Sequence, residues 1–227
     1  MEQFIRTEDG RTLRVEEAGQ PDGKPVLVHH GTPSVGHVYA PHAADARGRG
    51  IRLIAYDRPG YGGSTPKPGR SIADCTDDVR AIAGALGLDR LAVWGVSGGG
   101  PHALACAARL PDLVVAVASV ASIAPYGAPG LDYFSGMGEG NVEDTRLFLD
   151  DPAAARAKSL ADREQLLAAT AEDMAAAFPT LVSAVDAAAL TPELGRYFAT
   201  CNHDALAVGV EGWWDDGCAH IQRWGFD

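Results

Sequence analysis

Short apolar runs alternate with helical patterns over the first half of the chain. Four of these runs have the length and composition of β-strands, at residues 25–30, 51–56, 90–96 and 114–121. Three other segments are predicted helices, at residues 41–49, 72–86 and 98–110. In the second helix apolar residues recur at helical spacing, Ser71 is placed as the N-cap, and Gly87 follows the end. This alternation predicts an α/β fold, in which a mostly parallel sheet carries helices on both faces.

The apolar runs also predict how deeply the strands are buried. Strands of a parallel sheet that is covered on both faces are nearly continuous in apolar residues, and segment 114–121 has this composition. We therefore expect both of its faces to be covered. At the start of the chain, residues 3–7 and 12–17 flank the turn signal Asp9-Gly10, which predicts a β-hairpin.

The composition changes after residue 121. Residues 141–216 are rich in alanine and show no strand pattern, with helix starts at Asn141, Asp151-Pro152 and Thr191-Pro192. We interpret this region as an inserted helical lid. The predicted organisation is a core at residues 1–122, a lid at 123–220, and the start of a return to the core at 221–227, with the remainder of the sheet absent from this chain.

The charge and the cysteines exclude several classes of partner. The chain has a formal net charge of -11, whereas binding to nucleic acid or to an anionic membrane requires a basic surface. No segment has the length and composition of a transmembrane helix or a signal peptide. Four scattered cysteines, at 75, 106, 201 and 218, predict free thiols in the cytoplasm and no metal site. No phosphate-binding glycine loop is found, so no cofactor is expected.

One segment carries the signature of a nucleophile. Residues 95–99 read GVSGG and match G-x-S-x-G. Because glycine is abundant here, the match gains its weight from the strand predicted before it and the helix predicted after it. Such a sharp turn leaves no room for Cβ atoms at Gly95 and Gly99. Ser97 is therefore the candidate nucleophile.

An acyl-transfer site also needs hydrogen-bond donors for the oxyanion. The backbone N–H of Gly98 is one candidate, because it follows the nucleophile at the start of a helix. The second is expected from the loop after strand 25–30, which reads HHGTP at residues 29–33. Thr32 is the natural donor there, since Gly31 permits a sharp turn and Pro33 has no N–H.

With these motifs in place, the chain resembles the lid-bearing branch of the α/β-hydrolase fold, which includes esterases, epoxide hydrolase and dehalogenase relatives, and proline-iminopeptidase-like enzymes. The resemblance rests on HGTP at 30–33, DRPGYGGS at 57–64 and GVSGGG at 95–100. It implies a serine hydrolase that acts through an acyl-enzyme on a small ester or an amide or peptide. Serine at 97 argues against epoxide-hydrolase and dehalogenase chemistry, because those relatives use an aspartate there.

The resemblance also implies a catalytic acid and a histidine after the lid, and neither is found before the chain stops at Asp227. His30 and His102 are expected to be structural, and His203 and His220 to be solvated or locally hydrogen-bonded in the lid. We therefore predict that a C-terminal segment of the same protein, present as a second polypeptide after processing or a nick, supplies both residues. A truncated gene product is the alternative. In either case this chain alone is expected to be inactive.

Substrate contacts are expected from the lid. Glu211 beside Trp213 and Trp214 resembles the lid carboxylates that hold the amino group of a peptide in iminopeptidase-like relatives. Solvated acids with aromatic packing explain the same residues. Departures from the iminopeptidase motifs, HGTP instead of HGGPG and Gly98-Gly99 instead of Trp-Gly, leave an esterase equally open. A non-catalytic ligand-binding protein of this fold is the alternative function.

Overall fold

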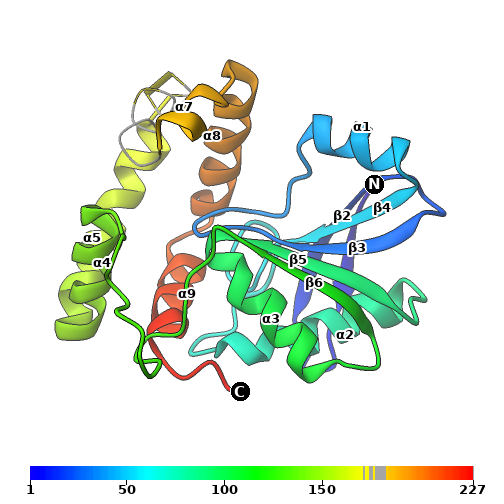
Figure 1. Ribbon diagram of the computed structural model, residues 1–227, viewed down its shortest axis with the longest axis horizontal. Helices are drawn as coiled ribbons and strands as arrows, with labels where there is room; N and C mark the ends of the chain where they lie inside the picture. The colour runs from blue at the N-terminus through cyan, green and yellow to red at the C-terminus, as the bar shows by residue number, and fades with distance from the viewer. Residues whose placement is uncertain (171, 174–175, 177–182, 227) are drawn as a thin grey trace.

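One mixed sheet forms the centre of the protein in a computed structural model (Figure 1). The structure describes residues 1–227 except 171, 174–175, 177–182 and 227. Its strands are β1 (Glu2–Arg6), β2 (Thr12–Gly19), β3 (Lys24–His29), β4 (Ile51–Tyr56), β5 (Leu91–Val96) and β6 (Val114–Val120). Their order is β1-β2-β4-β3-β5-β6. The pairs β3–β4, β3–β5 and β5–β6 are parallel, whereas β1–β2 and β2–β4 are antiparallel. The predicted hairpin and the mostly parallel sheet are therefore confirmed.

Helices cover both faces of this sheet (Figure 1). They are α1 (Ala40–Gly48), which packs on β2 and β4, and α2 (Cys75–Ala85) and α3 (Gly100–Arg109) on the opposite face. Two short 3₁₀ helices precede the latter pair, η1 (Ile72–Asp74) before α2 and η2 (Ser97–Gly99) before α3. The main core lies between the sheet and α2 and α3, where Leu13, Leu27, Ile82 and Leu91 are almost completely buried.

Strand β6 differs from its predicted environment. The sequence predicts a strand covered on both faces, but Val115 and Val120 are 51% and 48% exposed. The reason is position: β6 is the last strand in the sheet order and pairs with β5 on one side only. Its apolar composition is that of an interior strand, while its place in the described sheet is an edge.

The alanine-rich region folds into helices, as predicted. They are α4 (Glu139–Asp150), α5 (Pro152–Ala168), α7 (Ala184–Ala188), α8 (Pro192–Ala207) and α9 (Glu211–Ile221), and together they form the helical part of the molecule. The Asp151 and Thr191 side chains accept hydrogen bonds from Ala154 N and Leu194 N, so both act as N-caps. Part of the predicted lid and the last residue of the predicted return fall on the residues outside the described set. No helix in the described ranges is long and apolar enough to cross a membrane.

Two packing contacts help to fasten the helical part to the core. One is a small apolar cluster in which Val35 and Tyr61 pack against Ala205 and Leu206 of α8. The other is the segment after α9, where Trp224 packs into the main core and its carbonyl accepts a hydrogen bond from Ala73 N at 2.9 Å. Between these contacts, α9 passes close to the end of β5 and the start of α3 (Figure 1).

Candidate active site

Ser97 is the first residue of η2, on the sharp turn that follows β5. Its φ is +52°, in the left-handed region that residues with a side chain rarely adopt. The glycines around it explain how the turn is accommodated. A Cβ on Gly95 would lie 2.2 Å from the carbonyl oxygen of Gly99, and a Cβ on Gly99 would lie 2.3 Å from the carbonyl oxygen of His29. Only glycine fits at these two positions, as the motif predicts.

The loop after β3 lies beside this turn. A Cβ on Gly31 would lie 3.6 Å from Cβ of Ser97, and a Cβ on Gly98 would lie 2.4 Å from Oγ1 of Thr32. The two predicted oxyanion donors, Thr32 and Gly98, are therefore neighbours next to Ser97. Gly98 is in the first turn of a helix, where backbone N–H groups lack intrahelical acceptors. The N–H of Thr32 donates to no acceptor among the described residues.

A cavity of about 210 Å³ opens in front of Ser97, between the core and the helical part. Thr32, Ser97 and Gly98 form its wall on the core side. The helical part contributes apolar residues and a polar group made of Asp144, Lys158 and Asp162. Lys158 Nζ lies 3.1 Å from Asp144 Oδ1 and also pairs with the carboxylate of Asp162. The cavity is therefore small, with the Ser97 hydroxyl on one wall and a charged group on another.

The predicted substrate residues are separated by the structure. Trp213 lines the cavity that contains Ser97. Glu211 lies 3.2 Å from Arg156, which also stacks over the ring of Trp214. Neither Glu211 nor Trp214 belongs to the residues that line the cavity. The structure thus brings one of the three residues to Ser97 and leaves the other two beside Arg156.

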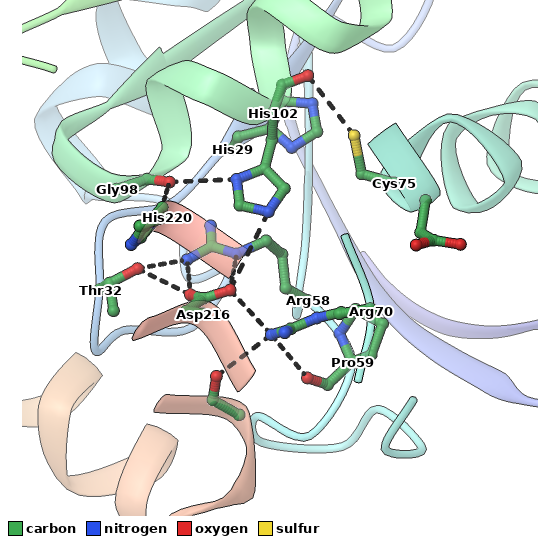
Figure 2. Close-up of polar contacts among 12 residues, drawn as sticks. His29, Thr32, Arg58, Pro59, Arg70, Cys75, Gly98, His102, Asp216 and His220 are labelled. Atoms are coloured by element: carbon green, nitrogen blue, oxygen red, sulfur yellow. Dashed lines mark hydrogen bonds and ion pairs between the residues drawn. The ribbon is translucent and has the colours of Figure 1, made fainter. Parts of the chain in front are cut away.

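Two histidines converge on Gly98, the residue after the candidate nucleophile Ser97. His102 Nδ1 and His220 Nε2 lie 3.0 and 3.1 Å from the carbonyl oxygen of Gly98 (Figure 2). Burial lowers the pKa of both imidazoles, which favours the neutral form. His220 was expected to be solvated or only locally hydrogen-bonded. Instead, α9 packs against the turn at residues 95–99 that carries Ser97, here called the elbow, and leaves His220 6% exposed. Each ring donates to a backbone carbonyl, so neither of these nitrogens is free to accept a proton from Ser97.

The other two histidines considered from the sequence also have partners. His30 Nε2 accepts a hydrogen bond from the N–H of Arg58 at 3.0 Å, and the ring is buried. This agrees with the structural role predicted for it. His203 is exposed and lies 3.2 Å from Asp204.

Sequence reasoning missed a buried acid, Asp216 of α9, whose side chain is 0% exposed (Figure 2). Its Oδ2 accepts hydrogen bonds from Thr32 Oγ1 at 2.7 Å, Arg58 Nη2 at 2.6 Å and Tyr61 Oη at 2.9 Å. Its Oδ1 accepts from Arg70 Nη2 at 2.8 Å. Two arginines and two hydroxyls thus surround this carboxylate, next to the loop after β3 that contains Thr32.

The charge of Asp216 is maintained by these neighbours. Burial alone would raise its pKa, but Arg58 and Arg70 outweigh burial and hold the pKa well below the usual value. A signal was present in the sequence. Gly212, Asp216 and His220 recur at intervals of four, so the acid lies on the same helix face as two other buried residues.

Within the described residues, no group of three or more His, Cys, Asp or Glu side chains is arranged to hold an ion. The groups that the described residues place at this site are the Ser97 hydroxyl, backbone N–H groups and a buried charged network around Asp216.

Comparison with known proteins identifies the fold. Residues 24–199 match the family described as alpha/beta hydrolase fold. The chain is 34% identical over 167 residues to the AB hydrolase superfamily protein YisY of Bacillus subtilis (strain 168), covering 71% of this chain and 59% of that protein. It is 33% identical over 115 residues to the proline iminopeptidase of Xylella fastidiosa (strain 9a5c), covering 48% of this chain and 36% of that enzyme. The chain therefore spans less than two thirds of these relatives.

A solved structure supports the same fold. Epoxide Hydrolase A from Mycobacterium thermoresistibile superposes with a TM-score of 0.70 at 23% identity, covering 99% of this chain and 76% of that one. At this identity the similarity concerns the fold and not the chemistry.

Proposed function

This chain belongs to the alpha/beta hydrolase fold family, and from that premise we propose that it carries the nucleophile and the oxyanion hole of a serine hydrolase. The observation that carries the proposal is the position of Ser97, at φ +52° on a glycine-bounded turn that faces the cavity. The neighbouring Thr32 and Gly98 supply N–H groups on the same wall. A hydroxyl and two donors on one cavity wall are the groups that acyl transfer needs.

In the proposed reaction, Ser97 Oγ attacks the carbonyl carbon of a small ester or amide. A histidine takes the hydroxyl proton, and the carbonyl oxygen becomes an oxyanion that accepts hydrogen bonds from Thr32 and Gly98. The intermediate then collapses, the leaving alcohol or amine receives the proton, and an acyl-enzyme remains. Water attacks this ester with the help of the same histidine, which releases the acid and restores Ser97.

We place the histidine and its acid in a segment of the same protein outside residues 1–227, present as a second polypeptide. Two observations support this placement. His102 and His220, which lie at the elbow, both donate to the Gly98 carbonyl. In addition, β6 presents an apolar outer edge where the described residues offer no pairing strand, and such an edge is suited to a further strand.

The cavity supports a small substrate. Its volume of about 210 Å³ lies below the range of about 300–1,000 Å³ that is usual for sites of drug-sized ligands. Glu211, the carboxylate expected to hold the amino group of a peptide, pairs instead with Arg156. We therefore propose a short-chain ester as the first substrate class to test, followed by small amides and N-terminal prolyl peptides.

Reaction with a fluorophosphonate tests this function. The full-length protein should become labelled on one serine, and mass spectrometry of the digested product should locate the label on Ser97. Ser97→Ala is the matched control and should show no label. Absence of labelling in the native protein, with its fold intact by circular dichroism, would contradict the enzyme and favour a non-catalytic ligand-binding protein. Denaturing electrophoresis of the same sample shows whether a second polypeptide accompanies residues 1–227.

A further inference from the structure

The buried carboxylate of Asp216 joins two parts of the molecule that are far apart in sequence. It lies on α9 of the helical part, yet it accepts a hydrogen bond from the Thr32 hydroxyl, 184 residues earlier in the chain. A buried ion pair usually stabilises a protein no better than a well-packed apolar group would. The position of this acid therefore needs a reason other than stability, and its partners point to the loop that contains Thr32.

Arg58 fixes the direction of that loop. Its Nη2 donates to the carbonyl oxygen of Gly31 at 2.9 Å and to Thr32 Oγ1 at 2.8 Å, and its Nη1 donates to the carbonyl oxygen of His30. In a trans peptide the C=O and the following N–H point in opposite directions. Because the Gly31 carbonyl is held toward Arg58, the N–H of Thr32 is turned away from it. This is the N–H assigned to the oxyanion.

Asp216 in turn fixes Arg58. The Asp216 carboxylate accepts from Arg58 Nη2 at 2.6 Å and from Nε at 3.4 Å, so the guanidinium plane is held at two points (Figure 2). Arg70 is the second arginine on the same carboxylate, at 2.8 Å. The group of Arg58, Arg70 and Asp216 carries a net positive charge beneath the loop, which favours a developing oxyanion.

We propose that Asp216 is a positioning residue for the oxyanion hole, which orients the Thr32 N–H directly through the Thr32 hydroxyl and indirectly through Arg58. The inference rests on the proposed function, because it treats the Thr32 N–H as an oxyanion donor. It adds that α9, an element of the helical part, determines the geometry of the core loop. Correct packing of α9 is then a condition for activity.

Two variants test this inference in the full-length protein. Each removes one hydroxyl that donates a hydrogen bond to Asp216 Oδ2. Thr32→Val removes the donor at 2.7 Å that belongs to the loop, and Tyr61→Phe removes the donor at 2.9 Å that does not. Thr32→Val should lower kcat by roughly tenfold to a hundredfold with KM nearly unchanged, as expected for a misplaced oxyanion donor. Tyr61→Phe should keep most of the wild-type kcat. Equal losses in the two variants would overturn the proposal.

The Asp216→Asn variant tests the carboxylate itself. It should lower kcat in the same way. The Thr32→Val/Asp216→Asn double variant should lose no more activity than the more impaired of the two single variants, because the contact that Thr32→Val removes is one of those that Asp216→Asn already disrupts. Fully additive losses would contradict a shared role. If Asp216→Asn does not fold, the comparison of Thr32→Val with Tyr61→Phe still decides the matter.

An activity-independent measurement separates this inference from the proposed function. The backbone amide signals of Gly31 and Thr32 in a ¹⁵N-labelled sample should shift in Thr32→Val and Asp216→Asn but not in Tyr61→Phe. Unchanged Gly31 signals in the first two variants would show that Asp216 does not orient the loop. If the loop signals shift while the wild-type protein fails to react with fluorophosphonate, the proposed function is wrong and the positioning contact stands.

Discussion

The Nε2 atom of His220 lies 3.1 Å from the carbonyl oxygen of Gly98, the residue that follows Ser97. The ring is buried, and burial lowers its pKa, so the neutral imidazole donates this hydrogen bond. A nitrogen that donates to a carbonyl is not available to accept the proton of the nucleophile. Through Nε2, His220 therefore supports the backbone at the turn that carries Ser97, and we propose that the general base is another group.

His220→Gln should consequently leave the shape of the pH profile of kcat/KM unchanged. We expect the free energy of unfolding to fall by about 1 kcal/mol, the usual contribution of one hydrogen bond. His203→Gln, which changes an exposed histidine, is the control and should have no effect on either quantity. A loss of activity of about a hundredfold or more, with the acidic limb of the profile removed, would identify His220 as the base instead.

Gly95→Ala should destabilise the protein strongly, because its Cβ would lie 2.2 Å from the carbonyl oxygen of Gly99. We expect a loss of about 3 kcal/mol in the free energy of unfolding, measured in urea. Gly84→Ala is the matched control, since Gly84 lies in α2 with no atom within 4 Å of a new Cβ. That substitution should stabilise the protein by about 0.5–1 kcal/mol. Similar effects in the two variants would contradict the close contact at the turn.

His37 should make the attachment of the helical part dependent on pH. Its Nδ1 lies 3.3 Å from Glu16 of β2, and its Nε2 lies 2.8 Å from Asp204 of α8. The hydrogen bond with Glu16 raises the pKa of His37 above 6.5, with a further contribution from Asp204 that outweighs burial and the nearby Arg14. Because the folded-state pKa is the higher one, this contribution to stability is fully present below pH 6.5. It is lost as the pH rises through the folded-state pKa.

Unfolding of the wild type and His37→Gln in urea checks whether the contribution of His37 to stability falls as the pH rises. The difference in stability between the two proteins should be larger at pH 6 than at pH 9, by on the order of 1 kcal/mol. His42→Gln is the control, because His42 is exposed whereas His37 is half-buried, and the His42 ring meets the Tyr39 ring edge to face. A difference that grows with pH would contradict the ion-pair contacts of His37.

The cysteines should react in the order of their exposure and not of their acidity. A hydrogen bond from Cys75, helped by His29, lowers the pKa of Cys106 to about 5, but the Cys106 side chain is completely buried. Cys218 is partly exposed although burial raises the pKa of its thiol. Iodoacetamide should therefore modify Cys218 first in the native protein, and all four cysteines in urea. Mass spectrometry of the digested protein measures the order, and prior reaction of Cys106 would show that its helix opens locally.

Local sequence determined the elements and the turn that holds Ser97. Asp9-Gly10 specified the hairpin, Asp151 and Thr191 specified helix starts as N-caps, and the glycines around Ser97 specified a tight turn. These features depend on the backbone preferences of a few neighbouring residues, so they are readable without knowledge of the rest of the chain.

Tertiary structure decided which of these elements meet. The exposure of β6 depends on which strand lies beside it, and its apolar sequence is equally compatible with an interior position. The burial of His220 and the contact between Asp216 and Thr32 depend on where α9 packs against the elbow. Gly212, Asp216 and His220 share one face of α9, and the partners of that face are far away in the sequence. Thr32 is 184 residues from Asp216, and Gly98 is 122 residues from His220. Contacts between residues so far apart in the sequence depend on how the whole core packs, and no local sequence pattern predicts that packing.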